Sequence, residues 1–179
     1  RTQVVRELGL HGSRFPEVAS FRVLDASGVL LYATAGRLDQ TNFSDRSYFR
    51  AFENGRGNGL FFSEVERESA SARLVLNVAV PLRYESGGLK GVIVAQLDLA
   101  YLAQWFDSVA VGAHGVVSFR RVEDGSLILR RPFLPDLLNR PLINHPLQQR
   151  LEAGARSGVL RMRATLDGVD RIYGYRRLG

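Results

Sequence analysis

Leu74-Val-Leu-Asn-Val-Ala-Val-Pro-Leu82 and Leu89-Lys-Gly-Val-Ile-Val-Ala-Gln-Leu97 are two apolar runs, rich in β-branched residues, that flank the short segment Glu85-Ser-Gly-Gly88. Runs of this length and composition are typical of strands, and a glycine-containing segment between two of them is typical of a tight turn. These residues therefore predict an antiparallel hairpin and, with it, a fold in which β-sheet dominates.

The predicted turn also decides which residues of the two strands face each other. With an even number of turn residues, Asn77 lies opposite Gln96, Val75 opposite Asp98, and Ala79 opposite Val94. The face that carries Asn77, Gln96 and Asp98 is polar, and it looks either to solvent or into a polar pocket. The other face of the first strand is expected to form the core, through Leu74, Leu76, Val78, Val80 and Leu82.

The rest of the chain repeats one order of elements. Before the central hairpin, the periodicity predicts a hairpin with strands at 21–25 and 29–32. A short helix at 46–52 follows it, with an N-cap candidate at Ser44 or Asp45. After the central hairpin, the periodicity predicts a helix at 99–106. The order hairpin, helix, hairpin then starts again, with strands at 116–121, 126–129, 158–165 and 169–176 and a helical stretch at 147–151. An internal repeat of this kind predicts tandem modules.

The repeat predicts an α+β chain with two modules, each an antiparallel sheet flanked by helices. Residues 1–18 are expected to be the end of a long N-terminal helix and a linker, 19–110 the first module and 111–179 the second. We expect the last strand of the second module to be truncated and the chain to be a piece of a longer protein.

Composition excludes several classes of activity. The chain has 179 residues and no cysteine, so it holds neither a thiol nucleophile nor a zinc–thiolate site. His11, His114 and His145 are too far apart in sequence to form a local metal motif, and no nucleophile or nucleotide-binding motif occurs. We therefore expect no enzymatic activity, no metal and no cofactor in this chain.

The net charge of +6 is unevenly distributed. Residues 111–179 carry 12 basic and 6 acidic side chains, whereas residues 1–110 carry 12 of each. Contact with an anionic surface and an arginine-rich coding bias both account for this excess. The arginines lack interleaved aromatic residues and a recognised motif, so nucleic acid is not an expected partner.

Four segments, in order, carry a resemblance to a known family. Asn42-Phe-Ser-Asp-Arg-Ser-Tyr-Phe49 resembles a helix start, and Gly91-Val-Ile-Val-Ala-Gln-Leu-Asp-Leu99 resembles the strand that closes the membrane-distal module, in double Cache (PAS-like) extracytoplasmic sensor domains. The stretch from Asp124-Gly125 to Arg130-Arg131-Pro132 and the stretch Asp167-Gly-Val-Asp-Arg-Ile-Tyr-Gly-Tyr175 resemble two hairpins of the membrane-proximal module.

The resemblance implies two PAS-like Cache modules in the periplasmic segment of an inner-membrane signalling protein. It implies a small-molecule ligand, a homodimer in the full-length, membrane-anchored protein, and a diguanylate cyclase or histidine kinase output, with a chemoreceptor as the next possibility. A ligand-free dimerisation or interaction module with the same fold is the alternative function.

Five residues are candidates for the ligand site. Arg46 is expected to hold a carboxylate and Asp98 an amine; the alternatives are a surface arginine paired with Asp45 and an N-cap for the helix at Leu99. Tyr48 is either a pocket wall or a core residue, and Asn77 and Gln96 complete the polar face. The aromatic cage of amino-acid-binding relatives is incomplete here, so the ligand stays open between a carboxylate and an amine metabolite.

Overall fold

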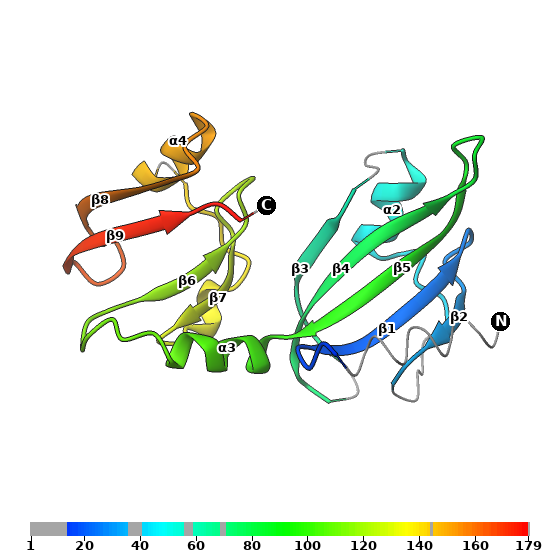
Figure 1. Ribbon diagram of the computed structural model, residues 1–179, viewed down its shortest axis with the longest axis horizontal. Helices are drawn as coiled ribbons and strands as arrows, with labels where there is room; N and C mark the ends of the chain where they lie inside the picture. The colour runs from blue at the N-terminus through cyan, green and yellow to red at the C-terminus, as the bar shows by residue number, and fades with distance from the viewer. Residues whose placement is uncertain (1–13, 36–40, 56–58, 69–70, 144, 179) are drawn as a thin grey trace. The chain divides into compact units, whose positions relative to one another are not determined.

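The computed structural model describes residues 14–35, 41–55, 59–68, 71–143 and 145–178, and most of the predicted N-terminal helix lies outside these ranges (Figure 1). The chain divides into two compact units, Arg1–Leu102 (unit 1) and Ala103–Gly179 (unit 2). The division falls inside a helix, whereas the predicted module boundary, after residue 110, lies beyond the end of that helix.

Unit 1 is built on a five-stranded antiparallel sheet with the strand order β2-β1-β5-β4-β3 (Figure 1). The strands are β1 (Val18–Asp25), β2 (Leu30–Ala33), β3 (Phe61–Arg67), β4 (Leu74–Arg83) and β5 (Leu89–Asp98). Both predicted hairpins, β1–β2 and β4–β5, are present. The last strand, β5, lies between β1 and β4 in the sheet and pairs with both, so it joins the two hairpins. The antiparallel α+β architecture expected from the sequence is therefore confirmed for this unit.

The predicted register of the β4–β5 hairpin is also confirmed. Asn77 pairs with Gln96, Val75 with Asp98, and Ala79 with Val94. Gln96 pairs on its other side with Ser20 of β1, so one row of polar residues runs across three strands. Directly paired residues project to the same face of a sheet. The face that holds Asn77 and Gln96 is called the site face from here on.

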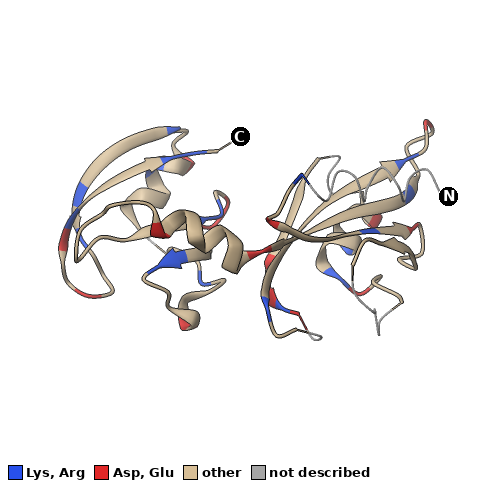
Figure 2. Cartoon of the chain, turned by 60° about the horizontal axis from the view of Figure 1, so that its bottom comes forward, with Lys and Arg blue, Asp and Glu red and all other residues tan. Residues whose placement is uncertain are grey.

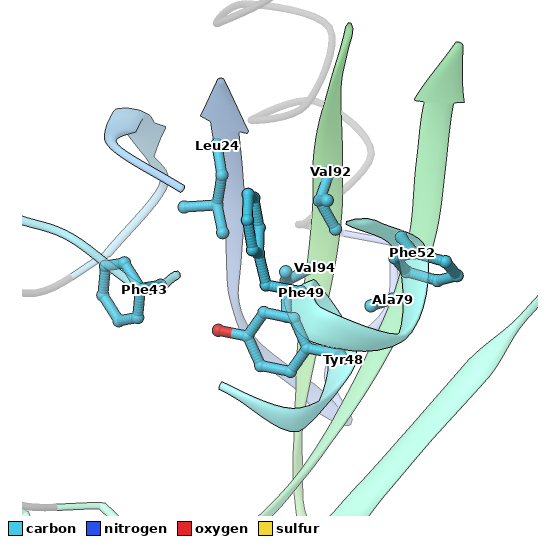
Figure 3. Close-up of a cluster of buried hydrophobic side chains, with 8 residues drawn as sticks. All are labelled: Leu24, Phe43, Tyr48, Phe49, Phe52, Ala79, Val92 and Val94. Atoms are coloured by element: carbon cyan, nitrogen blue, oxygen red, sulfur yellow. The ribbon is translucent and has the colours of Figure 1, made fainter. Parts of the chain in front are cut away.

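The core of unit 1 lies on the site face, contrary to the prediction. Helix α2 (Ser47–Glu53) places Tyr48, Phe49 and Phe52 against the sheet, where each side chain is 1% exposed (Figure 3). The rest of this aromatic cluster comes from Leu24, Phe43, Ala79, Val92 and Val94. On the face that was predicted to be core, only Leu76 is fully buried, and Leu74, Val78, Val80 and Leu82 are half-buried. Both faces of β4 are apolar enough to be covered, so alternation alone did not identify the face on which α2 packs.

Helix α2 begins later than predicted, and neither N-cap candidate caps it. The N-cap is Arg46, whose side chain makes no capping hydrogen bond. Ser44 instead lies in a local turn, in which its backbone N–H donates to Asn42 Oδ1 at 2.8 Å. The helix start is thus set by packing of its aromatic face and not by a side-chain cap. The Arg46 guanidinium, which has only donors and cannot cap the helix, reaches towards the sheet instead.

Helix α3 (Leu99–Asp107) follows β5 without a break, and unit 2 continues from it. Unit 2 contains β6 (Val117–Arg120), β7 (Leu127–Arg131), a 3-10 turn η1 (Pro135–Leu137), α4 (Pro146–Glu152), β8 (Ser157–Arg163) and β9 (Asp170–Arg176). Its strands form two separate antiparallel hairpins, β6–β7 and β8–β9, as predicted. Among the described residues, no helix is both long enough and apolar enough to cross a membrane.

Candidate ligand-binding site

The site face of unit 1 changes along the strands from an apolar end to a polar end. At the apolar end, Leu24 of β1 pairs with Val92 of β5. Towards the other end, Ser20, Gln96 and Asn77 replace these apolar residues, and all three are at most 5% exposed. A row of polar side chains is therefore buried beside the aromatic cluster, where each polar atom requires a partner.

Arg46 and Asn77 meet through a glutamate of β3. Arg46 Nη1 donates to Glu66 Oε2 at 3.0 Å, and Asn77 Nδ2 donates to Glu66 Oε1 at 3.4 Å. Arg46 is also 4.0 Å from Asp45, the surface partner considered from the sequence. The carboxylate of Glu66 thus occupies the position that a ligand carboxylate would take on Arg46.

Gln96 belongs to a second charged group, centred on Glu68. In the amide orientation that satisfies both of its ends, Gln96 donates to Glu68 Oε1 at 2.8 Å and accepts from Arg22 at 3.3 Å. Arg22 Nη2 is 3.7 Å from Glu68 Oε1, and Arg73 Nη2 is 3.0 Å from Glu68 Oε2. The guanidinium carbon of Arg22 also lies 5.3 Å from the centre of the Phe43 ring.

Asp98 has two partners at the end of β5. Its Oδ1 accepts from the backbone N–H of Ala100 at 2.8 Å, so the predicted capping role at the start of α3 is confirmed. Its Oδ2 lies 3.6 Å from Arg73 Nη1. Arg73 therefore connects Asp98 to Glu68, and the two acidic groups share one guanidinium.

Tyr48 belongs to the aromatic cluster (Figure 3), and its hydroxyl lies within electrostatic range of Arg22, Arg46 and Glu66. Burial raises the pKa of its hydroxyl to about 12, while the charges of Arg22 and Arg46 act in the opposite direction. The phenol therefore stays protonated at any physiological pH, so its hydroxyl can both donate and accept a hydrogen bond. Of the two roles considered for Tyr48, core packing is what the structure shows, and its hydroxyl faces the charged groups.

Two buried polar atoms at this site have no hydrogen-bond partner among the described residues. They are Arg22 Nε, a donor, and Asn77 Oδ1, an acceptor. Arg22 is 8% exposed and Asn77 3% exposed. A buried polar group without a partner costs about 1–3 kcal/mol, so a bound group that offers one donor and one acceptor would be stabilised here.

Four residues of this site were not predicted: Arg22, Glu66, Glu68 and Arg73. A bulge between Phe62 and Val65 changes which residues of β3 face the site: Phe61 pairs with Ala79, and Glu66 pairs with Val75. Because these partners both lie on the site face, the odd-numbered Phe61 and the even-numbered Glu66 lie there too.

We expect the stability of unit 1 to fall in acid because of Glu68. A hydrogen bond from Ser71 and a weaker contribution from Arg73 hold the pKa of Glu68 below its ordinary value of 4.5. A carboxyl with a lowered pKa stabilises the fold above its unfolded-state pKa and loses this contribution as the pH falls through its folded-state pKa. Urea midpoints between pH 7 and pH 3 should therefore decrease less steeply for Glu68→Gln than for wild type.

Glu64 provides the matched control, because it lies exposed on β3, the strand that ends one residue before Glu68. Glu64→Gln should leave the acid dependence of the urea midpoint as it is in wild type. Equal slopes for wild type and Glu68→Gln would show that Glu68 does not carry the effect.

Residues 100–179 match the model of a dCache_1-like family described as a histidine kinase sensor domain. No curated protein matches the sequence. Among solved structures, the extracellular domain of rpHK1S-Z16, described as a histidine kinase, is 25% identical, with a TM-score of 0.80, over 99% of this chain and 72% of its own.

Two further structures share the fold at lower identity. The ligand-binding domain of the Pseudomonas aeruginosa amino acid chemoreceptor PctC, in complex with GABA, is 18% identical over 96% of this chain and 80% of its own, with a TM-score of 0.55. The sensor domain of the V. cholerae histidine kinase DctB is also 18% identical, over 97% of this chain and 72% of its own, with a TM-score of 0.53.

Proposed function

We propose that this chain is a Cache sensor domain, as its motifs predicted, and that it detects a small molecule outside the cytoplasm for a bacterial membrane-bound signalling protein. The proposed location is periplasmic, and the proposed output is a histidine kinase or a diguanylate cyclase, with a chemoreceptor as the alternative. A histidine kinase is favoured by the family model that matches residues 100–179 and by the solved structure at 25% identity.

The observation that carries the proposal is the pair of unpartnered atoms on the site face. Arg22 Nε and Asn77 Oδ1 are buried, and no described residue satisfies either of them. Proteins seldom leave such atoms unpaired, because each one loses its hydrogen bonds to water without replacement. A ligand between α2 and the site face, close to Arg46, Tyr48, Asn77, Gln96 and Asp98, would satisfy them.

The charges around the site favour a ligand with both a positive and a negative group. Three guanidinium groups (Arg22, Arg46, Arg73) face the carboxylates of Glu66, Glu68 and Asp98, and the exposed Asp45 also lies 4.0 Å from Arg46, so each guanidinium is paired without a ligand. A ligand carboxylate could replace Glu66 on Arg46 while a ligand amine replaces Arg73 on Asp98. This exchange adds no net charge to the site, whereas a ligand of one sign would add one. We therefore propose a small zwitterion in preference to a simple carboxylate or amine.

The finer architecture is also a proposal. Unit 2 repeats the hairpin, helix, hairpin order of unit 1, which supports two tandem Cache modules, with the first in the membrane-distal position. A homodimer and a membrane anchor in the full-length protein are proposed from the family resemblance.

We expect Arg46→Ala and Asp98→Ala each to weaken ligand binding by about 1–3 kcal/mol, because each removes a charge-assisted hydrogen bond. A thermal-shift screen with zwitterions, dicarboxylates and diamines identifies the ligand class, and isothermal titration of the best compound then measures the loss. Arg50→Ala is the control: Arg50 is an exposed residue of the same helix, and its removal should leave the affinity unchanged.

Two results would contradict the proposal. Wild-type affinity in both Arg46→Ala and Asp98→Ala would place the ligand elsewhere. If no compound class stabilised the chain, the alternative of a ligand-free interaction module would be favoured, and the self-association of the full-length sensor would be the next measurement.

A further inference from the structure

The last hairpin of unit 2 carries most of the excess positive charge of the chain. Residues 156–178 contain six arginines and two aspartates, so they hold four of the six net positive charges (basic positions in blue in Figure 2). One of the aspartates, Asp167, is already paired with Arg171 at 2.7 Å. A coding bias enriches arginine along a whole chain, so it does not account for an excess over acidic residues that is confined to one hairpin.

The two faces of this hairpin differ in exposure. Side chains alternate along a strand, and in β8 and β9 the alternation separates an inner face of buried and half-buried residues from an outer face of exposed ones. The outer face consists of Ser157, Val159, Arg161 and Arg163 on β8 and of Asp170, Ile172, Gly174 and Arg176 on β9. At its middle, Val159 is 65% exposed and Ile172 is 74% exposed. Two aliphatic side chains thus stand in water among arginines, which is typical of a surface that contacts a partner.

The charge of the outer face is only partly compensated. Asp170 is its one acidic residue, and the register places it opposite Arg163 at the closed end of the hairpin. Further along, Arg161 and Arg176 form no ion pair with any described residue. The outer face therefore presents uncompensated positive charge on both sides of its aliphatic middle.

An open hollow of about 740 Å³ lies at the open end of the hairpin. Arg156, Arg176 and Arg177 line it, and none of the described residues around it is acidic. Gly174, also in the lining, has no atom of the described part of the chain within 4 Å of a Cβ built on it, so its backbone is open to a bulky group. The planar forks of guanidinium groups form paired hydrogen bonds with phosphate oxygens. The hollow therefore suits a phosphate head group.

We propose that the outer face of the β8–β9 hairpin docks on a bilayer surface that contains anionic phospholipids. Lipid phosphates would occupy the hollow among the arginines, while Val159 and Ile172 enter the boundary between head groups and acyl chains. A second copy of the chain is a poorer partner, because its outer face would bring arginines against arginines. Nucleic acid is a poorer partner too, since Tyr173 and Tyr175 lie on the inner face and leave no aromatic ring on the outer face for bases to stack on.

The test is co-sedimentation of the 179-residue chain with vesicles of phosphatidylcholine, with and without phosphatidylglycerol. Wild type is expected to bind only the vesicles with phosphatidylglycerol at low salt, and to be released as the salt concentration rises. The double variant Arg161→Gln/Arg176→Gln should bind roughly 25-fold more weakly, because each basic residue near such a surface contributes about fivefold. Ile172→Ser should weaken binding about threefold at unchanged charge, because it removes an aliphatic group that enters the bilayer boundary.

The matched control is Arg140→Gln/Arg150→Gln, which removes the same charge from exposed positions of unit 2 outside the hairpin. It should weaken binding less than about twofold, because salt screens charges that lie away from the bilayer surface. Arg46→Ala should leave vesicle binding intact, so this result does not depend on the proposed ligand site. Far-UV circular dichroism verifies that each variant is folded.

Three results would overturn the proposal. The first is no binding of wild type to vesicles with phosphatidylglycerol. The second is equal weakening by the two double variants, since net charge alone would then attract the chain. The third is a dimer in light scattering that Ile172→Ser dissociates, because the outer face would then be an interface between copies of this chain.

Discussion

Phe49→Ala is expected to destabilise unit 1 by about 3–5 kcal/mol, a large fraction of the roughly 5–15 kcal/mol by which an ordinary domain is stable. Phe49 is 1% exposed and lies inside the aromatic cluster that joins α2 to the sheet (Figure 3). Its removal loses the transfer free energy of a whole ring and leaves a cavity, because the neighbouring Phe52 and Tyr48 are held by their own contacts with the sheet. Urea unfolding followed by circular dichroism measures the change.

Phe62→Ala is the control for this substitution, since it removes the same ring from a side chain that is 41% exposed. It should cost less than about 1.5 kcal/mol, as expected for a ring that is only partly removed from water. Similar losses for Phe49→Ala and Phe62→Ala would mean that α2 does not pack on the site face as described.

Gly28→Ala is expected to destabilise unit 1 by about 2–4 kcal/mol, from two causes that a control can separate. Gly28 has a φ of +80°, a region that costs a residue with a Cβ about 1–2 kcal/mol. In addition, a Cβ at this position would lie 2.6 Å from the backbone nitrogen of Ser44, which must then move. The displaced segment leads directly into α2, so the cost includes a disturbed helix start.

Gly87→Ala isolates the conformational cause. Gly87 has a φ of +87°, and no atom of the described part of the chain lies within 4 Å of a Cβ built on it. It should therefore cost only the 1–2 kcal/mol of the backbone conformation. The difference between the two urea-derived free energies reports the contact with Ser44, and a difference near zero would contradict the close approach of the β1–β2 turn to this segment.

The β4–β5 hairpin was predictable from sequence because its information is local. A short turn and alternating side chains determine the pairing of Asn77 with Gln96, and the structure has this pairing. The side of the sheet on which α2 packs is a tertiary choice. Alternation on β4 left it undetermined, since Val75 and Leu76, which point to opposite faces, are both fully buried.

The candidate site was predictable only in part for a related reason. The motif at 42–49 pointed to Arg46, and the hairpin register pointed to Asn77 and Gln96. The structure places all three at the polar end of the site face. Glu66 reaches this face because a bulge changes the alternation of β3, and a bulge leaves no clear signal in composition. Arg22 is one scattered arginine among many, and only the pairing of β1 with β5 reveals where it lies.

The direct passage from β5 into α3 would let the proposed site act on helix order. Asp98 ends the central strand and at the same time accepts from the first turn of α3 at Ala100. An amine that replaces Arg73 at Oδ2 leaves this cap in place, whereas one that also drew Oδ1 away would remove a cap worth about 0.5–2 kcal/mol and would link binding thermodynamically to fraying of this turn. Linkage is reciprocal: a partner that holds α3 helical must weaken such a ligand by the same factor, between about twofold and thirtyfold. Under the proposed function, Asp98 would thereby convert ligand binding into a local order–disorder equilibrium at the start of a helix that ends in unit 2.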